Sequence, residues 1–186
     1  MARAETGAVE TYVALLRGIN VGGKNVLPMK ELARLFADAG AADVRTYIQS
    51  GNVVFRAGAK VVATLASRVG DAIRREFGFD SPVILRSADE LRLALERNPF
   101  ANEDSERLHF MFMRDEPAPE RVAKLDPHRS PPDRFAVRGR EVYLHLPGGA
   151  GKSKPTNAYF DATLATIGTI RNMRTVIALI AMCGQG

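Results

Sequence analysis

The sequence predicts an α+β protein made of two ferredoxin-like halves, each with the element order βαββαβ and an antiparallel sheet. Two observations support this fold class. Segments with strand and helix periodicity follow one another in this order twice along the chain, and an acid-containing stretch over residues 98–107 separates the two series. We therefore place the first half at residues 11–98 and the second half, with an additional C-terminal helix, at residues 107–186. A short helix and a linker join the halves.

The first half begins with a continuous apolar run over residues 12–16, which is typical of a strand buried on both faces. Glycines mark where two helices end, because Gly40 and Gly78 directly follow stretches with helical periodicity. Ser87 and Glu90 form a capping-box pattern, which predicts the start of a third helix. The expected strands are residues 12–16, 44–48, 53–55 and 82–86, and the expected helices are residues 28–39, 60–77 and 88–98.

The second half has the same element order, without a visible sequence repeat. A turn at Gly139 predicts a hairpin, and Asn172 has the position of an N-cap for the last helix. The expected strands are residues 108–113, 135–138, 141–146 and a short one near Thr169, and the expected helices are residues 119–125, 155–165 and a final one from residue 173.

The composition excludes several classes of protein. With 46% hydrophobic and 25% charged residues, the 186-residue chain has an ordinary globular composition. The single cysteine, Cys183, excludes an internal disulfide, and with three scattered histidines the sequence predicts no metal and no cofactor. The longest apolar run, residues 176–183, is too short to cross a bilayer. We therefore expect a cytoplasmic protein with no membrane partner.

Positive charge is concentrated in two windows of the chain, although the net charge of +5 is modest for a nucleic-acid-binding protein. Residues 11–30 contain three basic residues and no acid, and residues 142–186 contain four basic residues and one acid. Both windows are rich in glycine. These charges are therefore expected on loops, where ligands often bind.

The first window contains a glycine-rich loop over residues 18–25. Arg17 stands where a buried strand ends, Asn20 and Lys24 add hydrogen-bond donors, and the adjacent glycines allow a ligand to approach the backbone. In the alternative interpretation the glycines simply form a turn and Asn20 bonds to the backbone. The sequence leaves both interpretations open.

The second window contains a segment, residues 148–153, that resembles a phosphate-binding loop, although Leu146 stands where the Walker pattern requires glycine. Ser153 and Lys154 precede a helix, whose N-terminal amides favour anions. The alternative is an ordinary connection with solvated lysines. Arg171 directly precedes the capping residue of the last helix, where a cation favours a nearby anion.

No residue pattern indicates catalysis. Cys183 fits a structural thiol better than a nucleophile. Strand periodicity predicts that His109 and His145 share a sheet face with Met111, which is more typical of a packed face than of a catalytic pair. The acids over residues 103–106 fit a solvated linker. Catalytic residues are therefore unknown, and it stays open whether the protein is an enzyme.

Four segments of the chain have the character of family motifs. Residues 12–25 (YVALLRGINVGGKN) and 47–55 (YIQSGNVVF), with the later segments 153–157 and 171–175, resemble the bacterial domain-of-unknown-function 1697 family. The resemblance covers nearly the whole chain, but it implies no activity, because the family name states none. The motifs coincide with the two basic windows and with the hairpin that contains Asn52.

We expect the basic loops of both halves to come together and bind an anionic, phosphate-bearing small molecule or nucleotide. The candidate ligand-binding residues are Arg17, Asn20, Lys24, Asn52, Ser153, Lys154 and Arg171. Two alternatives stay open. The open sheet faces would serve protein interaction or oligomerisation, in a monomer or a homodimer, or they would bind single-stranded nucleic acid through residues such as Tyr143 and His145.

Overall fold

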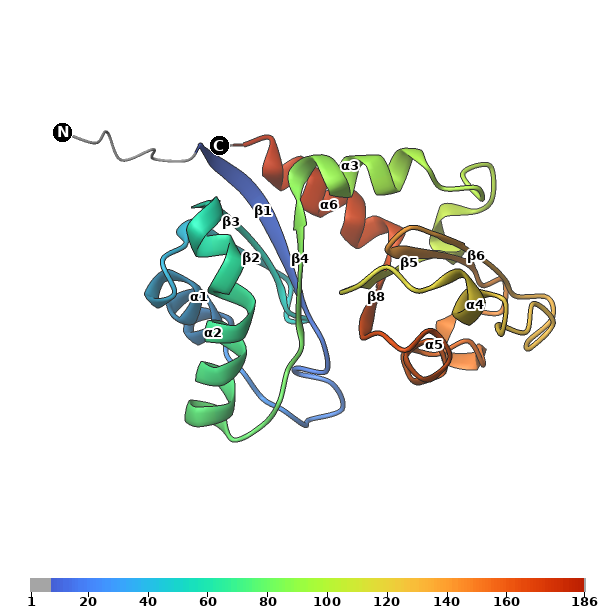
Figure 1. Cartoon of the computed structure of the whole chain (residues 1–186), viewed down its shortest axis with the longest axis horizontal. Coiled ribbons are helices and arrows are strands. Elements are labelled where there is room, and N and C mark those ends of the chain that lie inside the picture. The colour runs from blue at the N-terminus through green and yellow to red at the C-terminus, as the bar shows by residue number, and fades with distance from the viewer. Residues whose placement is uncertain (1–7, 186) are drawn as a thin grey trace. The chain divides into compact units, whose positions relative to one another are not determined.

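Two four-stranded antiparallel sheets, each packed against helices, form the part of the chain that the computed structural model describes, residues 8–185 (Figure 1). These residues divide into two compact units, one of residues 8–90 with residues 181–185 and the other of Leu91–Ile180. The predicted fold class, an α+β protein with two ferredoxin-like halves, is confirmed. Relative to the predicted halves at residues 11–98 and 107–186, residues 91–98 group with the second unit and the last residues of the chain with the first.

The sheet of the first unit has the strand order β2-β3-β1-β4, with β1 paired antiparallel to both β3 and β4. This order follows from the βαββαβ sequence of elements and is the ferredoxin-like arrangement. The elements are β1 (Val9–Leu16), α1 (Met29–Asp38), β2 (Ala42–Tyr47), β3 (Asn52–Gly58), α2 (Ala59–Phe77) and β4 (Val83–Ser87), followed by α3 (Ala88–Glu96).

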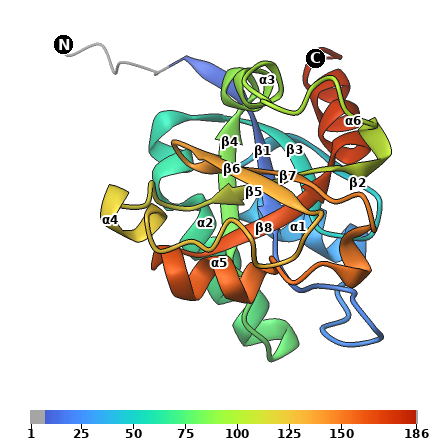
Figure 2. The same cartoon turned by 90° about the vertical axis from the view of Figure 1, so that its right-hand side faces the viewer.

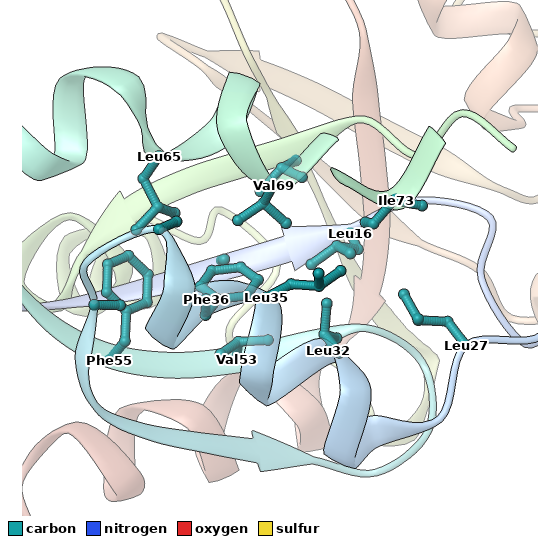
Figure 3. Close-up of a cluster of buried hydrophobic side chains, with 14 of the residues drawn as sticks. Leu16, Leu27, Leu32, Leu35, Phe36, Val53, Phe55, Leu65, Val69 and Ile73 are labelled. Atoms are coloured by element: carbon teal, nitrogen blue, oxygen red, sulfur yellow. The ribbon is translucent and has the colours of Figure 1, made fainter. Parts of the chain in front are cut away.

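Alternate residues of the central strands face α1 and α2 and form the hydrophobic core of the first unit (Figure 3). Leu16 and Phe55 contribute from the sheet, and Phe36 and Val69 contribute from the helices, each at most 1% exposed. Burying one such side chain contributes about 1.5–3 kcal/mol. Packing on the sheet, more than helix propensity, therefore stabilises α1 and α2.

The capping box predicted at the start of α3 is present. Ser87 N donates to Glu90 Oε2 at 2.8 Å, and Glu90 N donates to Ser87 Oγ at 3.1 Å. The two side chains thereby satisfy backbone N–H groups that have no partner within the helix.

The expectation that β2 extends to a half-buried Ile48 is wrong. The strand ends at Tyr47, and Ile48 has a φ of +46° and is 53% exposed. The reason is the connection to β3: Tyr47 pairs with Asn52, so the chain has to reverse direction over residues 48–51. A β-branched residue rarely adopts this left-handed conformation, which costs on the order of 1–3 kcal/mol.

The second unit repeats the arrangement, with the strand order β6-β7-β5-β8 (Figure 2). Its core contains Met111 and Leu144 of the sheet and Phe160 of the helix beside it. Asn172 Oδ1 accepts a hydrogen bond from Thr175 N at 2.8 Å and caps the last helix, as predicted. The elements are β5 (Leu108–Met113), α4 (Pro119–Val122), β6 (Arg134–Arg138), β7 (Glu141–His145), α5 (Asn157–Leu164), β8 (Gly168–Asn172) and α6 (Met173–Cys183).

The two sheets also correspond at one pair of side chains. Arg86 is the fourth residue of β4 and pairs with Val13 of β1, while Arg171 is the fourth residue of β8 and pairs with Phe110 of β5. The two arginines are only 1% and 8% exposed, and each is followed by the residue that caps the next helix. The internal repeat therefore extends from element order to individual residues.

Candidate functional site

The side chain of Asn20 fixes the shape of the loop that follows β1. Its Nδ2 donates to Leu27 O and to Gln49 O, both at 2.9 Å, and its Oδ1 accepts from Leu27 N at 2.8 Å. Asn20 has a φ of +54°, a conformation that asparagine tolerates better than most residues. All three bonds go to the backbone, so Asn20 connects the end of this loop to the β2–β3 turn.

The cations of this loop lie at its start and at its tip. Arg17 is partly exposed and its backbone is anchored, since Arg17 N donates to Pro82 O at 3.0 Å and Arg17 O accepts from Ser81 Oγ at 2.9 Å. Lys24 is exposed, and its backbone N donates to Val21 O at 3.0 Å across the two glycines. The loop therefore presents positive charge on a well-defined backbone.

Asn52 lies in the interior of the first unit. It is 0% exposed, and its Nδ2 donates to Ser50 Oγ at 2.9 Å and to Tyr47 O at 3.2 Å. These bonds stabilise the strained turn between β2 and β3. Asn52 thus shapes the loop, as Asn20 does.

The basic loop of the second unit is built from two segments that are far apart in the sequence. Lys154 N donates to Ser130 Oγ, and Arg129 Nε donates to Lys154 O, both at 3.4 Å. The guanidinium carbon of Arg129 lies 4.0 Å from the centre of the Tyr159 ring, a cation–π contact. The proline-rich segment over residues 126–133 therefore places Arg129 beside Lys154.

Several basic residues lie on or beside this loop. Arg129, Lys152 and Lys154 are all exposed. A Cβ at Gly149 would lie 3.5 Å from Arg107 Nη1, so the Arg107 guanidinium lies against the glycine-rich turn. The loop leads into the N-terminus of α5, where backbone N–H groups point outward and favour anions. These features attract negative charge to one small area.

Two polar atoms in this loop and at the start of α5 are buried without a hydrogen-bond partner among the residues that the structure describes. They are Ser153 Oγ, directly before Lys154, and Asn157 Oδ1, on the first residue of α5. Leaving such an atom unsatisfied costs about 1–3 kcal/mol, so in folded proteins these atoms usually bind water or a ligand. The serine hydroxyl donates, and a half-turn of the asparagine amide presents its NH₂ group. Both residues can therefore offer donors to an anion.

Arg171 is separate from this loop. It is 8% exposed, and its Nη1 donates to Thr169 Oγ1 at 2.7 Å and to Ile170 O at 3.0 Å. Ile170 packs in the core with α5, so Arg171, its neighbour along β8, lies on the opposite face of the sheet. Burial lowers the pKa of Arg171 to about 10, which leaves the guanidinium positive at neutral pH.

The seven predicted residues thus fall into groups within each unit. Arg17, Asn20 and Lys24 lie on one loop, and Asn20 connects that loop to the turn that precedes Asn52. Ser153 and Lys154 lie together on the second loop. The expectation that the loops of both halves meet at one ligand stays a prediction.

The prediction that His109 and His145 share one sheet face is wrong. Leu108 pairs with His145 and His109 pairs with Leu144, and directly paired residues point to the same face. His109 therefore lies on the face of Met111, while His145 lies on the opposite face. The error arose because the register between two strands is not visible in the periodicity of either strand.

Most of the aromatic side chains considered for nucleic-acid binding are buried. Tyr12 and Phe55 stack on each other within the first core, with ring centres 5.8 Å apart. Phe55 is 0% exposed and Tyr143 is 1% exposed. Single-strand binding uses exposed aromatic rings on which bases stack, so Phe55 and Tyr143 provide no such platform.

A charged cluster of the second unit includes an acid that the sequence placed in a solvated linker. Arg134 Nη2 bonds to Glu103 Oε1 and lies 3.0 Å from His145 Nδ1, while His145 Nε2 lies 3.8 Å from Glu103 Oε2. The hydrogen bond from Arg134 lowers the pKa of Glu103. The Arg134 guanidinium also lies 5.2 Å from the centre of the Phe100 ring. Both nitrogens of His145 face protein groups, so the cluster is a network of polar contacts within the protein.

His109 is expected to make the stability of the protein depend on pH. Burial lowers the pKa of His109, although a hydrogen bond to the Arg107 backbone opposes this effect. The unfolded chain therefore takes up a proton near pH 6.5, at a higher pH than the folded chain does (about 6.5 is the ordinary value). The stability that neutral His109 contributes is complete above about pH 6.5 and is lost as the pH falls below it.

A His109→Leu variant removes this proton uptake. Between about pH 7.5 and 5.5, which is about one unit on either side of the ordinary histidine pKa, wild type should lose more stability than the variant. Urea unfolding at a series of pH values measures the difference. Parallel pH profiles for the two proteins would contradict the assignment.

Two features are absent from the described residues, 8–185. No helix there is long and apolar enough to cross a membrane. No group of three or more His, Cys, Asp and Glu side chains there is arranged to hold a metal ion.

Comparisons with known proteins give a family and a fold. A family model described as "Protein of unknown function (DUF1697)" matches residues 9–143. The solved structure of conserved bacterial protein SP0830 from Streptococcus pneumoniae is similar to this chain, with a TM-score of 0.70 and 24% sequence identity over 95% of this chain and 99% of that chain. At this identity the likeness concerns the fold alone. No curated protein matches the chain.

Proposed function

This chain belongs to the DUF1697 family of proteins of unknown function, and from its basic loops we propose that it binds an anionic, phosphate-bearing small molecule or nucleotide. The observation that supports this best is the second-unit loop. There, Ser153 and Asn157 carry buried polar atoms without partners, next to the exposed cations Lys154 and Arg129 and the start of α5. Donors and positive charge on a helix N-terminus are what a phosphate group requires.

The expected affinity follows from the number of contacts. A hydrogen bond to a charged group contributes about 1.5–3 kcal/mol. Three or four such bonds, after the cost of association, give dissociation constants in roughly the micromolar to millimolar range. A ligand of this kind therefore binds reversibly.

The other predicted residues take two roles in this proposal. Arg17 and Lys24 are cations that a ligand can reach from the first unit's loop. Asn20, Asn52 and Arg171 act through the backbone and the sheet, because their side chains are bonded within the protein. The groups around the second loop stabilise negative charge, so the function we propose is binding.

Thermal-shift and calorimetric titrations against inorganic phosphate, a series of nucleotides and a series of sugar phosphates test this function. We expect at least one ligand to raise the unfolding temperature of wild type. Lys154→Ala and Arg129→Ala should each weaken its binding by about 10–100-fold, the equivalent of one charge-assisted hydrogen bond. Arg17→Ala tests the contribution of the first loop.

Lys60→Ala is the matched control. It makes the same change in net charge at an exposed lysine of α2, far in the sequence from either loop. We expect it to bind like wild type. If no ligand changes the unfolding temperature, or if Lys60→Ala weakens binding as much as Lys154→Ala does, the proposed function is incorrect.

A further inference from the structure

Three exposed apolar side chains of the first unit lie around Asn20. Val21 is 65% exposed, Val26 is 62% exposed and Ile48 is 53% exposed, and they are half of the large hydrophobic residues exposed among those that the structure describes. Val21 follows Asn20 directly, while Val26 and Ile48 immediately precede the two residues to which the Asn20 side chain is bonded. Hydrogen bonds of 2.9 Å thus bring the backbone next to these residues together at Asn20, and we call the three exposed side chains the Asn20 patch.

Ile48 is kept in the Asn20 patch against its conformational preference. Its φ of +46° suits asparagine or glycine, and with 53% exposure only part of its side chain packs inside the unit. Gly51 of the same turn adopts a left-handed conformation at less cost, with a φ of +77°. Strain of this kind is found where a residue serves binding more than folding.

The charged residues within the two segments that carry the Asn20 patch are all basic. Residues 17–30 and 47–51 contain Arg17, Lys24 and Lys30 and no acid. Lys24 and Lys30 are exposed. A complementary surface therefore has carboxylates around a small apolar centre.

We propose that the Asn20 patch docks an acidic segment of another protein. Apolar side chains of that segment would cover Val21, Val26 and Ile48, and its carboxylates would face Lys24 and Lys30. A second copy of this chain fits less well, because a symmetric contact would bring the same positive loops together. Single-stranded nucleic acid also fits less well, because the three exposed side chains are aliphatic and bases stack on aromatic rings.

Selection from a phage-displayed library of random 12-residue peptides against the full chain tests this proposal. We expect the selected peptides to combine Asp or Glu with Leu, Ile or Phe. In fluorescence polarisation, a Val21→Ser/Val26→Ser variant should bind a selected peptide at least ten-fold more weakly than wild type. Val9→Ser, which changes a valine of β1 that is 51% exposed, is the matched control and should bind like wild type.

An Ile48→Asn variant separates docking from folding. Asparagine accepts the left-handed conformation, so we expect the unfolding midpoint to rise by about 2–4 °C. Peptide binding should nevertheless weaken at least ten-fold, because an apolar contact is lost. A loss of binding together with a gain in stability cannot result from damage to the fold.

Several outcomes would overturn the proposal. The first is a selection that yields no peptide or only basic peptides. The second is unchanged peptide binding in both patch variants. The third is an oligothymidylate that binds to wild type but no longer binds to the same variants. The response to the phosphate and nucleotide series should be unchanged in the patch variants, since none of the three apolar side chains belongs to the small-molecule proposal. The two proposals can therefore fail independently.

Discussion

An Asn20→Ala variant is expected to lose at least about 3 kcal/mol of its free energy of unfolding, because three hydrogen bonds of roughly 1 kcal/mol each disappear. The side chain donates to Leu27 O and Gln49 O and accepts from Leu27 N, and no alanine atom can replace these bonds. The φ of +54° adds a further cost, since alanine is less tolerant of this conformation. Urea unfolding of wild type and variant measures the loss.

Asn25→Ala is the matched control for this experiment. Asn25 has nearly the same conformation, with a φ of +51°, but its side chain makes one exposed hydrogen bond, to Gly18 O at 2.8 Å. The backbone cost is shared by the two variants, so their difference reports the two additional bonds of Asn20, about 2 kcal/mol. Equal losses in the two variants would show that the side-chain bonds of Asn20 do not hold the loop.

A Gly51→Ala variant is also expected to lose about 3 kcal/mol of its free energy of unfolding, but for a different reason. A Cβ at this position would lie 2.7 Å from Leu16 Cβ, 3.0 Å from Ile19 Cδ1 and 3.1 Å from Ile19 Cγ1. Leu16 and Ile19 are each 1% exposed, so neither can move aside without disturbing the core. The new methyl group therefore forces the β2–β3 turn away from the sheet.

Gly78→Ala separates the steric cost from the conformational cost. Gly78 has the same φ of +77°, at the end of α2, but a Cβ there would have no atom within 4 Å. This variant should lose only about 1 kcal/mol, the price of the left-handed conformation alone. Thermal and urea unfolding of both variants test the comparison, and a Gly78 variant as unstable as the Gly51 variant would contradict it.

The first of these predictions concerns a residue that the sequence selects for a different reason. The sequence presents Asn20 as a hydrogen-bond donor to a ligand. In the structure its side-chain NH₂ group and its side-chain oxygen instead form hydrogen bonds with the backbone. Its alternative interpretation was already available, because asparagine in a glycine-rich loop commonly bonds to the chain. Only the distances decide between the two, since both interpretations use the same side-chain atoms.

The second loop contains a residue that could not be selected from the sequence at all. Ser153 and Lys154 could be selected because they directly precede a helix. Arg129 could not be selected, because its contacts with Lys154 and Tyr159 join segments 25 and 30 residues apart, as the bonded and stacked pairs show. A proline-rich stretch carries no periodicity from which to infer where it packs. Only the tertiary contacts of Arg129 indicate that it belongs to this loop.

By itself, the sequence determined the order of the elements, the strand and helix periodicities, the capping box at Ser87 and the N-cap at Asn172. These features depend on residues close together in the chain, so local chemistry is sufficient for them. The tertiary structure alone decided that His109 and His145 point to opposite faces, that Arg171 is buried, and that Val21, Val26 and Ile48 lie exposed around one asparagine. Each of these depends on strand register or on contacts between distant segments, and such contacts form only when the whole unit packs.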